Sequence, residues 1–417
     1  MRFLCQIVFF LMLIGLFCAP HAVGSGIPFS GNHTFDQLQR IYAEIPDTSD
    51  YLADYQQGLN QTPLNITNAL YLGRASLKAG NTSEAERQFS FAIEKDRESK
   101  EAWRGLLVSL TLQEKYDELL NRSIERITLT PLDDEVWLDK GWALSEKGDA
   151  SGALEAYKQV SAINPKNVFA PYYSAWAYGH LRQQQNAIKS YEKVSLLSPQ
   201  YGGVSGNIAF LLLGMNNYGD AMGYLEKALD WYPNWTEARR SKGMVLYHLD
   251  RKDEAIKEWD EVLAIDANYT YVYLSKGEAL KDMGRTDEAL TTVDQGLLRS
   301  QNDTNLLELR GDVLISLNRY EEAMKTYEKV IAANQSGFDT VYSTWGKGYA
   351  LEKQGRTKEA QEAYTQGLSL LTDSLTPNGP FYWHTKGLLL EGLGRSSDAK
   401  VAYIKAEELK YPKFFYL

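Results

Sequence analysis

One interval of 34 residues recurs along most of this 417-residue chain and constrains its fold more than any other feature. Small and helix-ending residues return at that interval in three separate series. The alanines are Ala85, Ala153, Ala187, Ala221, Ala255, Ala289, Ala323, Ala360 and Ala399. The glycines are Gly73, Gly141, Gly243, Gly277, Gly311, Gly348 and Gly387, and the prolines are Pro63, Pro131, Pro165, Pro199 and Pro233. Three series with one period indicate a chain built from repeated structural units.

One such unit, residues 134–167, reads as two amphipathic helices joined by a short turn. Gly148 is suited to the left-handed conformation that ends the first helix, and Pro165 stops the second. Gly141 and Ala153 lie where the two helices face each other, and only small residues let helices approach closely there. The unit therefore predicts an antiparallel helix pair.

Counted from Asp134 as position 1, these units resemble the tetratricopeptide repeat family. That family has a large residue at position 4, small residues at 8, 20 and 27, an aromatic at 24 and proline at 32. Position 4 is Trp103, Trp137, Tyr273 and Trp383, and position 24 is Phe89, Tyr157, Tyr191, Trp259, Tyr327, Tyr364 and Tyr403. The resemblance implies an all-α fold, a right-handed superhelical solenoid of antiparallel helix pairs.

The repeats divide the chain as follows. Residues 1–24 read as a signal peptide, and 25–65 as a linker with a degenerate first repeat. Eight units fill 66–340, with an insertion at 338–340 that we expect to lengthen a loop. Two more units fill 341–413, with an insertion at 375–379, and 414–417 form an aromatic tail. That tail is interpreted either as a lid on the last helix pair or as a surface for oligomer formation.

The predicted turn between the two helices is Gly, Asn or Asp in eight units, because these residues tolerate positive φ. They are Gly80, Gly148, Asn216, Asp250, Gly284, Asn318, Gly355 and Gly394. The unit at Lys100 is the weakest, since Leu107 and Leu119 replace both small residues. We expect its helices to pack less closely.

The amino terminus favours a secreted or cell-surface protein. A basic start precedes the apolar run Phe3–Phe17, and small residues before position 25 suit a signal cleavage site. The run is shorter than the roughly 20 residues of a membrane-spanning helix, so an uncleaved membrane anchor is the weaker alternative. Both cysteines, Cys5 and Cys18, lie in this segment, so the mature chain would hold itself by packing without disulfides.

Nine asparagines stand in Asn-x-Ser/Thr sequences that suit glycosylation: Asn32, Asn60, Asn65, Asn81, Asn121, Asn234, Asn268, Asn302 and Asn334. A second interpretation applies to three of them. Thr236, Thr270 and Thr304 follow at one repeat position, where a threonine would cap the next helix. Both interpretations stay open from sequence alone.

The sequence holds no motif of a catalytic site. Phosphate-binding loops, a nucleophile elbow and the zinc sequence His-Glu-x-x-His are absent. His33, His180, His248 and His384 fall in four separate units, so no metal and no cofactor is expected, and the chain is predicted not to be an enzyme. A net charge of −10 argues against nucleic acid and anionic membrane as partners.

The resemblance implies that positions 2, 5, 9 and 12 of each first helix line a concave groove. Read along the chain, these positions are first basic, then aromatic, then acidic with a second aromatic spot. The acidic part contains Glu278, Glu308 and Asp312, followed by Tyr342, Trp345 and Tyr349. The predicted ligand-binding residues are Arg74, Arg104, Trp142, Tyr172, Trp176, Phe210, Met244, Tyr247 and Trp345. The alternative is that the aromatics merely fill space between neighbouring helices.

We therefore expect a non-enzymatic scaffold that binds a protein or peptide segment in its groove. The alternative is a glycan-binding surface protein or envelope-assembly factor, in which Trp142, Trp176 and Trp345 stack on sugar rings of a polysaccharide. Membrane contact is expected only through an uncleaved signal.

Overall fold

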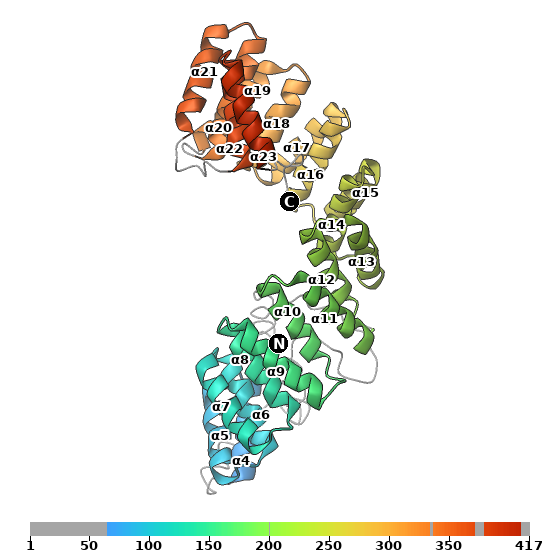
Figure 1. Ribbon diagram of the computed structural model, residues 1–417, viewed down its shortest axis with the longest axis vertical. Coiled ribbons are helices and arrows are strands. Elements are labelled where there is room, and N and C mark those ends of the chain that lie inside the picture. Colours follow the sequence, from blue (N-terminus) through green and yellow to red (C-terminus); the bar gives the residue numbers. More distant parts are fainter. Residues whose placement is uncertain (1–64, 200, 334–336, 372–378, 410–417) are drawn as a thin grey trace. The chain divides into compact units, whose positions relative to one another are not determined.

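The computed structural model describes residues 65–199, 201–333, 337–371 and 379–409. The described residues form helices, turns and bends and contain no strand. The chain divides into two compact units, unit 1 up to Pro233 and unit 2 from Asn234 onward. Each is an all-α succession of helix pairs, as the sequence predicts (Figure 1).

Unit 1 contains five described helix pairs, in which each odd-numbered helix follows and packs on the even-numbered one. Its helices are α4 (Ile66–Lys78), α5 (Thr82–Lys95), α6 (Lys100–Leu112), α7 (Tyr116–Leu129), α8 (Asp134–Glu146), α9 (Ala150–Ile163), α10 (Phe169–His180), α11 (Gln184–Leu197), α12 (Gly203–Gly214) and α13 (Tyr218–Trp231).

Unit 2 repeats the arrangement with five further described pairs. Its helices are α14 (Thr236–His248), α15 (Lys252–Ile265), α16 (Thr270–Asp282), α17 (Thr286–Arg299), α18 (Thr304–Ser316), α19 (Tyr320–Ala333), α20 (Phe338–Lys353), α21 (Thr357–Leu370), α22 (Pro380–Gly392) and α23 (Ser396–Glu408).

The turn inside each pair is set by one residue in the left-handed conformation. At Gly148 φ is 82°, its N–H donates to the Ser145 carbonyl, and the next N–H, of Asp149, donates to the Leu144 carbonyl. The Asp149 side chain then accepts from the Gly152 N–H and caps the following helix. All eight predicted turn residues have positive φ. Glu114 and Arg182 adopt the same conformation in the two pairs where the sequence gives no such signal.

The close approach within a pair comes from glycine against an aromatic ring. A Cβ on Gly141 would lie 2.3 Å from the Tyr157 ring, so only glycine fits opposite that ring. The predicted alanine series is at most 2% exposed throughout. Further glycine and ring pairs are Gly73 with Phe89, Gly243 with Trp259, Gly311 with Tyr327, Gly348 with Tyr364 and Gly387 with Tyr403.

Several rings are also clamped from the neighbouring repeat. Phe89 meets Gly105 of α6 as well as Gly73 of α4. Tyr327 likewise lies between Gly311 and Gly346, from successive first helices. One ring therefore joins two repeats, and this couples each pair to the next.

The weakest unit behaves as expected. Leu107 and Leu119, which replace its two small residues, are buried at 1% and 0% exposure. Their bulk keeps α6 and α7 farther apart than the helices of the other pairs.

The structure corrects two expectations. The insertion Phe338–Thr340 does not lengthen a loop; it forms the first turn of α20. Gly337 takes an extended N-cap conformation, and Asp339 in the first turn favours a helix start. Thr236, Thr270 and Thr304 are the first helical residues rather than the caps, which are Trp235, Tyr269 and Asp303.

Some expectations fall outside the described residues. These are the signal peptide at 1–24, the degenerate first repeat up to residue 64, most of the second insertion at 375–379 and the tail at 414–417. Among the helices that are described, none has the length and apolar character needed to cross a membrane.

Candidate binding grooves

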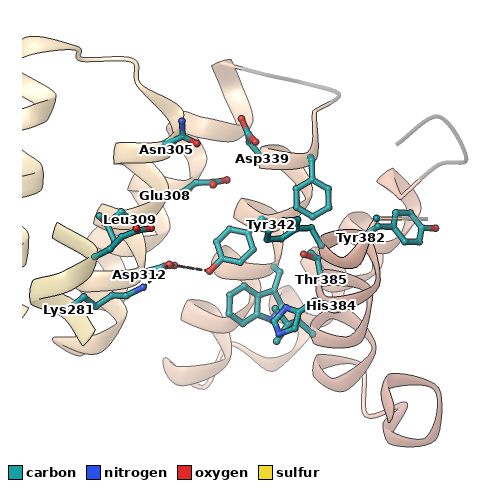
Figure 2. Close-up of a pocket in the computed structure, with 16 residues that line it drawn as sticks. Lys281, Asn305, Glu308, Leu309, Asp312, Asp339, Tyr342, Tyr382, His384 and Thr385 are labelled. Carbon is teal, nitrogen blue, oxygen red and sulfur yellow. Dashed lines mark hydrogen bonds and ion pairs between the residues drawn. The ribbon is translucent and has the colours of Figure 1, made fainter. Parts of the chain in front are cut away.

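Unit 2 contains a cavity of about 550 Å³ between successive first helices. Residues from α16, α18, α20 and α22 line it, and Figure 2 shows their side chains converging on one space. We call this cavity the groove of unit 2. Its lining is Glu278, Lys281, Asn305, Glu308, Leu309, Asp312, Phe338, Asp339, Tyr342, Trp345, Gly379, Phe381, Tyr382, His384, Thr385 and Leu388.

Helices α16 and α18 supply three of the carboxyl groups that line the groove. Asp312 accepts hydrogen bonds from the Tyr327 hydroxyl at 2.7 Å and from the Tyr342 hydroxyl at 3.1 Å. Lys281 Nζ lies 3.5 Å from Asp312 Oδ2 and neutralises that carboxylate. Asp312 is therefore an internal hub, held by two phenols and one cation.

Glu308 and Glu278 occupy a different electrostatic environment. Burial raises the pKa of the Glu308 carboxyl to about 9, and the nearby Asp339 and Asp312 add to the rise. Burial likewise raises the pKa of Glu278 to about 8, opposed by Lys281. Glu308 is 8% exposed and accepts one hydrogen bond, from the Ser343 hydroxyl at 3.1 Å. Near neutral pH both carboxyls are therefore mainly protonated, as expected for acids held out of water.

Aromatic side chains from α20 and α22 form the opposite side. The Trp345 ring lies 5.3 Å from Tyr342 and 5.8 Å from Tyr349, measured between centroids, so the three rings follow one face of α20. Burial lowers the pKa of His384, which is accordingly neutral near pH 7. The groove thus sets carboxyl groups against aromatic faces.

Unit 1 contains a smaller hollow of about 400 Å³. Its lining comes from α10, α11 and α12: Ala175, Trp176, Gly179, His180, Tyr191, Asn207, Phe210 and Leu211. Trp176 is 40% exposed, and its ring meets the His180 ring edge-on at 4.1 Å. Two of the predicted ligand residues, Trp176 and Phe210, therefore line one hollow.

Other predicted ligand residues take part in packing. Trp142 lies against Tyr173 at 5.3 Å between ring centroids, and its indole N–H is buried without a partner. Tyr172 is 9% exposed and meets Tyr173, Tyr191 and a further tyrosine edge-on. These contacts favour the interpretation of Trp142 and Tyr172 as space-filling residues.

The two predicted arginines form ion pairs between repeats. Arg74 of α4 lies 3.0 Å from Glu101 of α6, and Arg104 of α6 lies 3.2 Å from Glu135 of α8. Their charges are used between first helices of unit 1. Their role in ligand binding stays a prediction.

Met244 and Tyr247 lie on α14, in unit 2, while the preceding aromatic residues lie in unit 1. The Tyr247 hydroxyl donates to Asp282 of the next first helix. The aromatic stretch that the sequence suggests is therefore divided between two units, and of the predicted ligand set Trp345 lines the groove of unit 2.

The predicted ligand set lacks the lining residues of α22 and of the inserted turn. Phe381, His384 and Leu388 occupy positions 2, 5 and 9 of the last repeat, so the same register would have found them. Phe338 and Asp339 come from the insertion, which was expected to lengthen a loop but forms the first turn of α20. No cluster of three metal-binding side chains occurs in the part of the chain that the structure describes.

Family models identify the family of the chain. One family model described as tetratricopeptide repeat matches residues 70–118, 208–270 and 274–337. A second model of the same description matches 134–167 and 345–370, and together the matches cover more than half of the chain. The chain belongs to the tetratricopeptide repeat family. No curated protein matches it significantly.

One solved tetratricopeptide repeat structure shares the fold, and two further solved structures match in part. The C-terminal part of a repeat-containing protein from Cytophaga hutchinsonii is 14% identical, with a TM-score of 0.52, covering 57% of this chain and 97% of that one. YrrB, described as having an unusual peptide-binding site, is 20% identical, with a TM-score of 0.41 over 44% of this chain and 95% of its own. MamA is 24% identical, with a TM-score of 0.37 over 39% and 94%.

Membership in the tetratricopeptide repeat family supports a protein–protein interaction scaffold. Proteins of this family are typically non-enzymatic.

Proposed function

We propose that this tetratricopeptide repeat protein binds an extended segment of a partner protein in the groove of unit 2. The observation that supports the proposal is a cavity of about 550 Å³ lined by four successive first helices. Most of its lining residues occupy repeat positions 2, 5, 9 and 12 of successive units, so the groove runs across repeats and suits an elongated ligand. Apolar walls with a few converging polar groups are typical of binding sites.

Trp345 is the expected anchor of this interaction. It lines the groove at the middle of the aromatic side and is only partly buried by its own chain. A desolvated tryptophan in an interface contributes on the order of 2 kcal/mol, or roughly thirtyfold in affinity.

The test is a peptide selection against the full mature chain, followed by affinity measurements on the selected peptides. Trp345→Ala should weaken binding roughly thirtyfold. Leu298→Ala is the matched control, because Leu298 lies on α17, is 76% exposed and does not line the groove. Equal binding by the Trp345→Ala variant, with an unchanged circular dichroism spectrum, would overturn the proposal.

We further propose that the scaffold acts at the cell surface or in the envelope. The support is the signal-like sequence of residues 1–24, with its basic start and short apolar run. Sequencing the amino terminus of the protein recovered from its own cells tests this. A chain that begins at Ser25 in the envelope or medium is expected, and an intact Met1 in the cytosol would contradict it.

The glycan alternative retains one specific support. Trp176 is 40% exposed beside a hollow that also contains Asn207 and His180, an arrangement that suits stacking with a sugar ring. Trp142 is covered by Tyr173 and offers no comparable face. Titration with envelope polysaccharide, followed by tryptophan fluorescence in the parent chain and in Trp176→Phe, tests whether the protein binds glycan at this hollow. Absence of any response at millimolar sugar removes this alternative.

A further inference from the structure

We propose that the groove of unit 2 selects a cationic side chain, an arginine or lysine of the bound segment. The charge would lie against Glu308, and the stem would lie along the Trp345 ring. This inference rests on the proposed function, since it names the chemistry of the segment that the groove receives.

Glu308 is the first observation. Its side chain points from α18 into the groove, as Figure 2 shows, although the residue is only 8% exposed. One oxygen accepts from Ser343, and within the described ranges no lysine, arginine or histidine forms an ion pair with this carboxyl. A buried carboxyl without a countercharge is costly to ionise, so a cation that enters beside it gains a strong partner.

The internal cation of the groove is committed elsewhere. Lys281 Nζ lies 3.5 Å from Asp312 Oδ2, and Asp312 in turn holds the Tyr342 hydroxyl. Asp339 accepts from the Thr304 hydroxyl at 3.1 Å. With Glu278 on α16, the lining therefore carries four carboxyl groups and one lysine, and a cation that displaces the protons of Glu308 and Glu278 would meet an excess of negative charge.

The aromatic side supplies the second, independent observation. Elsewhere in unit 2 the chain's own lysines cover aromatic rings: Lys353 lies 5.0 Å from the Tyr349 centroid and Lys386 lies 4.9 Å from that of Trp383. Among the described residues, no such cation lies over Trp345. A guanidinium or ammonium group beside Trp345 would make the contact that its neighbours already have.

Binding of a cation should be coupled to proton release. Burial raises the pKa of Glu308 and of Glu278, so each carboxyl loses its proton when a cation takes the proton's place. Affinity should therefore rise with pH, up to about tenfold per pH unit for each carboxyl that ionises. The titratable and charged groups around Glu308 are Glu278 and Lys281 on α16, Asp312 on α18, Tyr327 on α19, Asp339 and Tyr342 on α20, and His384 on α22, while Asp282 on α16 acts on Glu278.

The experiment titrates the full mature chain with Nα-acetyl-arginine methylamide and, separately, with its neutral citrulline analogue. A guanidinium does not titrate in this range, so any pH dependence belongs to the protein. Isothermal titration in two buffers of different ionisation heat counts the protons released. We expect the arginine compound to bind at least tenfold more tightly at about pH 8.5 than at about pH 6.5.

Two variants test the assignment to Glu308. Glu308→Gln keeps the shape and can still accept from Ser343, and it should remove the preference for arginine over citrulline. Glu362→Gln makes the same charge change at an exposed position on α21 and should leave the preference unchanged. If Glu308→Gln does not fold, as judged by circular dichroism, Glu278→Gln provides the same test from α16.

The inference is overturned if both compounds bind alike, if affinity does not depend on pH, or if the arginine compound shows no binding at about 10 mM. Its failure is distinct from failure of the proposed function. Selected peptides that depend on Trp345 but tolerate citrulline in place of arginine would remove the inference alone. Selected peptides that ignore Trp345 would remove the proposed function itself.

Discussion

The first helices α10 of unit 1 and α18 of unit 2 carry different residues at the same repeat positions. In α10, positions 5 and 9 are Tyr172 and Trp176, and the neighbouring Tyr173 packs against four aromatic rings at centroid distances of 5.3 to 6.2 Å. In α18, positions 5 and 9 are the non-aromatic Glu308 and Asp312, and they line a groove of about 550 Å³. The side chains at and beside these positions distinguish a packed aromatic interior from an open groove.

The largest loss of stability should come from removing Tyr173, the ring at the centre of the aromatic cluster in unit 1. Tyr173→Ala deletes a side chain that is 6% exposed and in contact with four other aromatics. Loss of a large buried ring costs about 3–5 kcal/mol in free energy of unfolding. Urea denaturation followed by circular dichroism measures this. A loss below about 1 kcal/mol would mean that these aromatics are not a packed cluster, and the contrast between the units would fail.

A smaller change in stability should distinguish the buried Glu308 of unit 2 from an exposed surface carboxyl. Burial raises the pKa of Glu308 to about 9 in the folded chain, well above its ordinary value of 4.5. The folded state then keeps a proton that the unfolded state releases, so stability falls as pH rises between these two values. Glu308→Gln should remove that fall and gain about 1 kcal/mol or more over the parent at about pH 9.

Denaturation midpoints across this pH range, compared with those of Glu362→Gln, check the expectation. Parallel curves for the parent and Glu308→Gln would show that Glu308 is solvated, and the groove would then be no more than an acidic surface.

The smallest effect should come from the open ring of unit 1. Trp176 stands less than one helical turn from Tyr173 on α10 but is 40% exposed. Trp176→Ala should therefore lower the free energy of unfolding by less than about 1 kcal/mol, because little packing is lost. The same denaturation assay measures it beside Tyr173→Ala. A cost equal to that of Tyr173→Ala would place Trp176 in the packed cluster and close the hollow as a candidate site.

The fold could be predicted because its determinants repeat. A ring at position 24 needs a glycine or another small residue opposite it, and these needs are local enough to be visible as a 34-residue period. Glu114 and Arg182 show the limit of such signals. Both residues have positive φ, which is energetically unfavourable for their residue types and is imposed by the surrounding helix pair. Neither Glu nor Arg is a residue type from which positive φ would be predicted.

The candidate site was only partly predictable. The register placed Glu278, Glu308 and Asp312 on one face, but it could not show that Glu308 is buried or that Lys281 neutralises Asp312 instead. The register did not show that Trp142 and Tyr172 both pack against Tyr173, because Tyr173 lies outside the groove positions; their role in ligand binding stays a prediction. Which aromatic rings contact one another depends on three-dimensional packing and cannot be read from the repeat period.

The doubly clamped rings have a practical consequence for anyone who wishes to shorten this chain. Tyr327 needs Gly311 from its own repeat and Gly346 from the next one, so a cut between α19 and α20 would bare half of its ring to water. A fragment should therefore include each ring together with both of its glycine partners. Where the second partner is missing at the end of the fragment, the ring should be replaced by a polar residue. Truncations at the 34-residue repeat boundaries would instead expose an apolar aromatic surface at the cut, and we expect such fragments to aggregate.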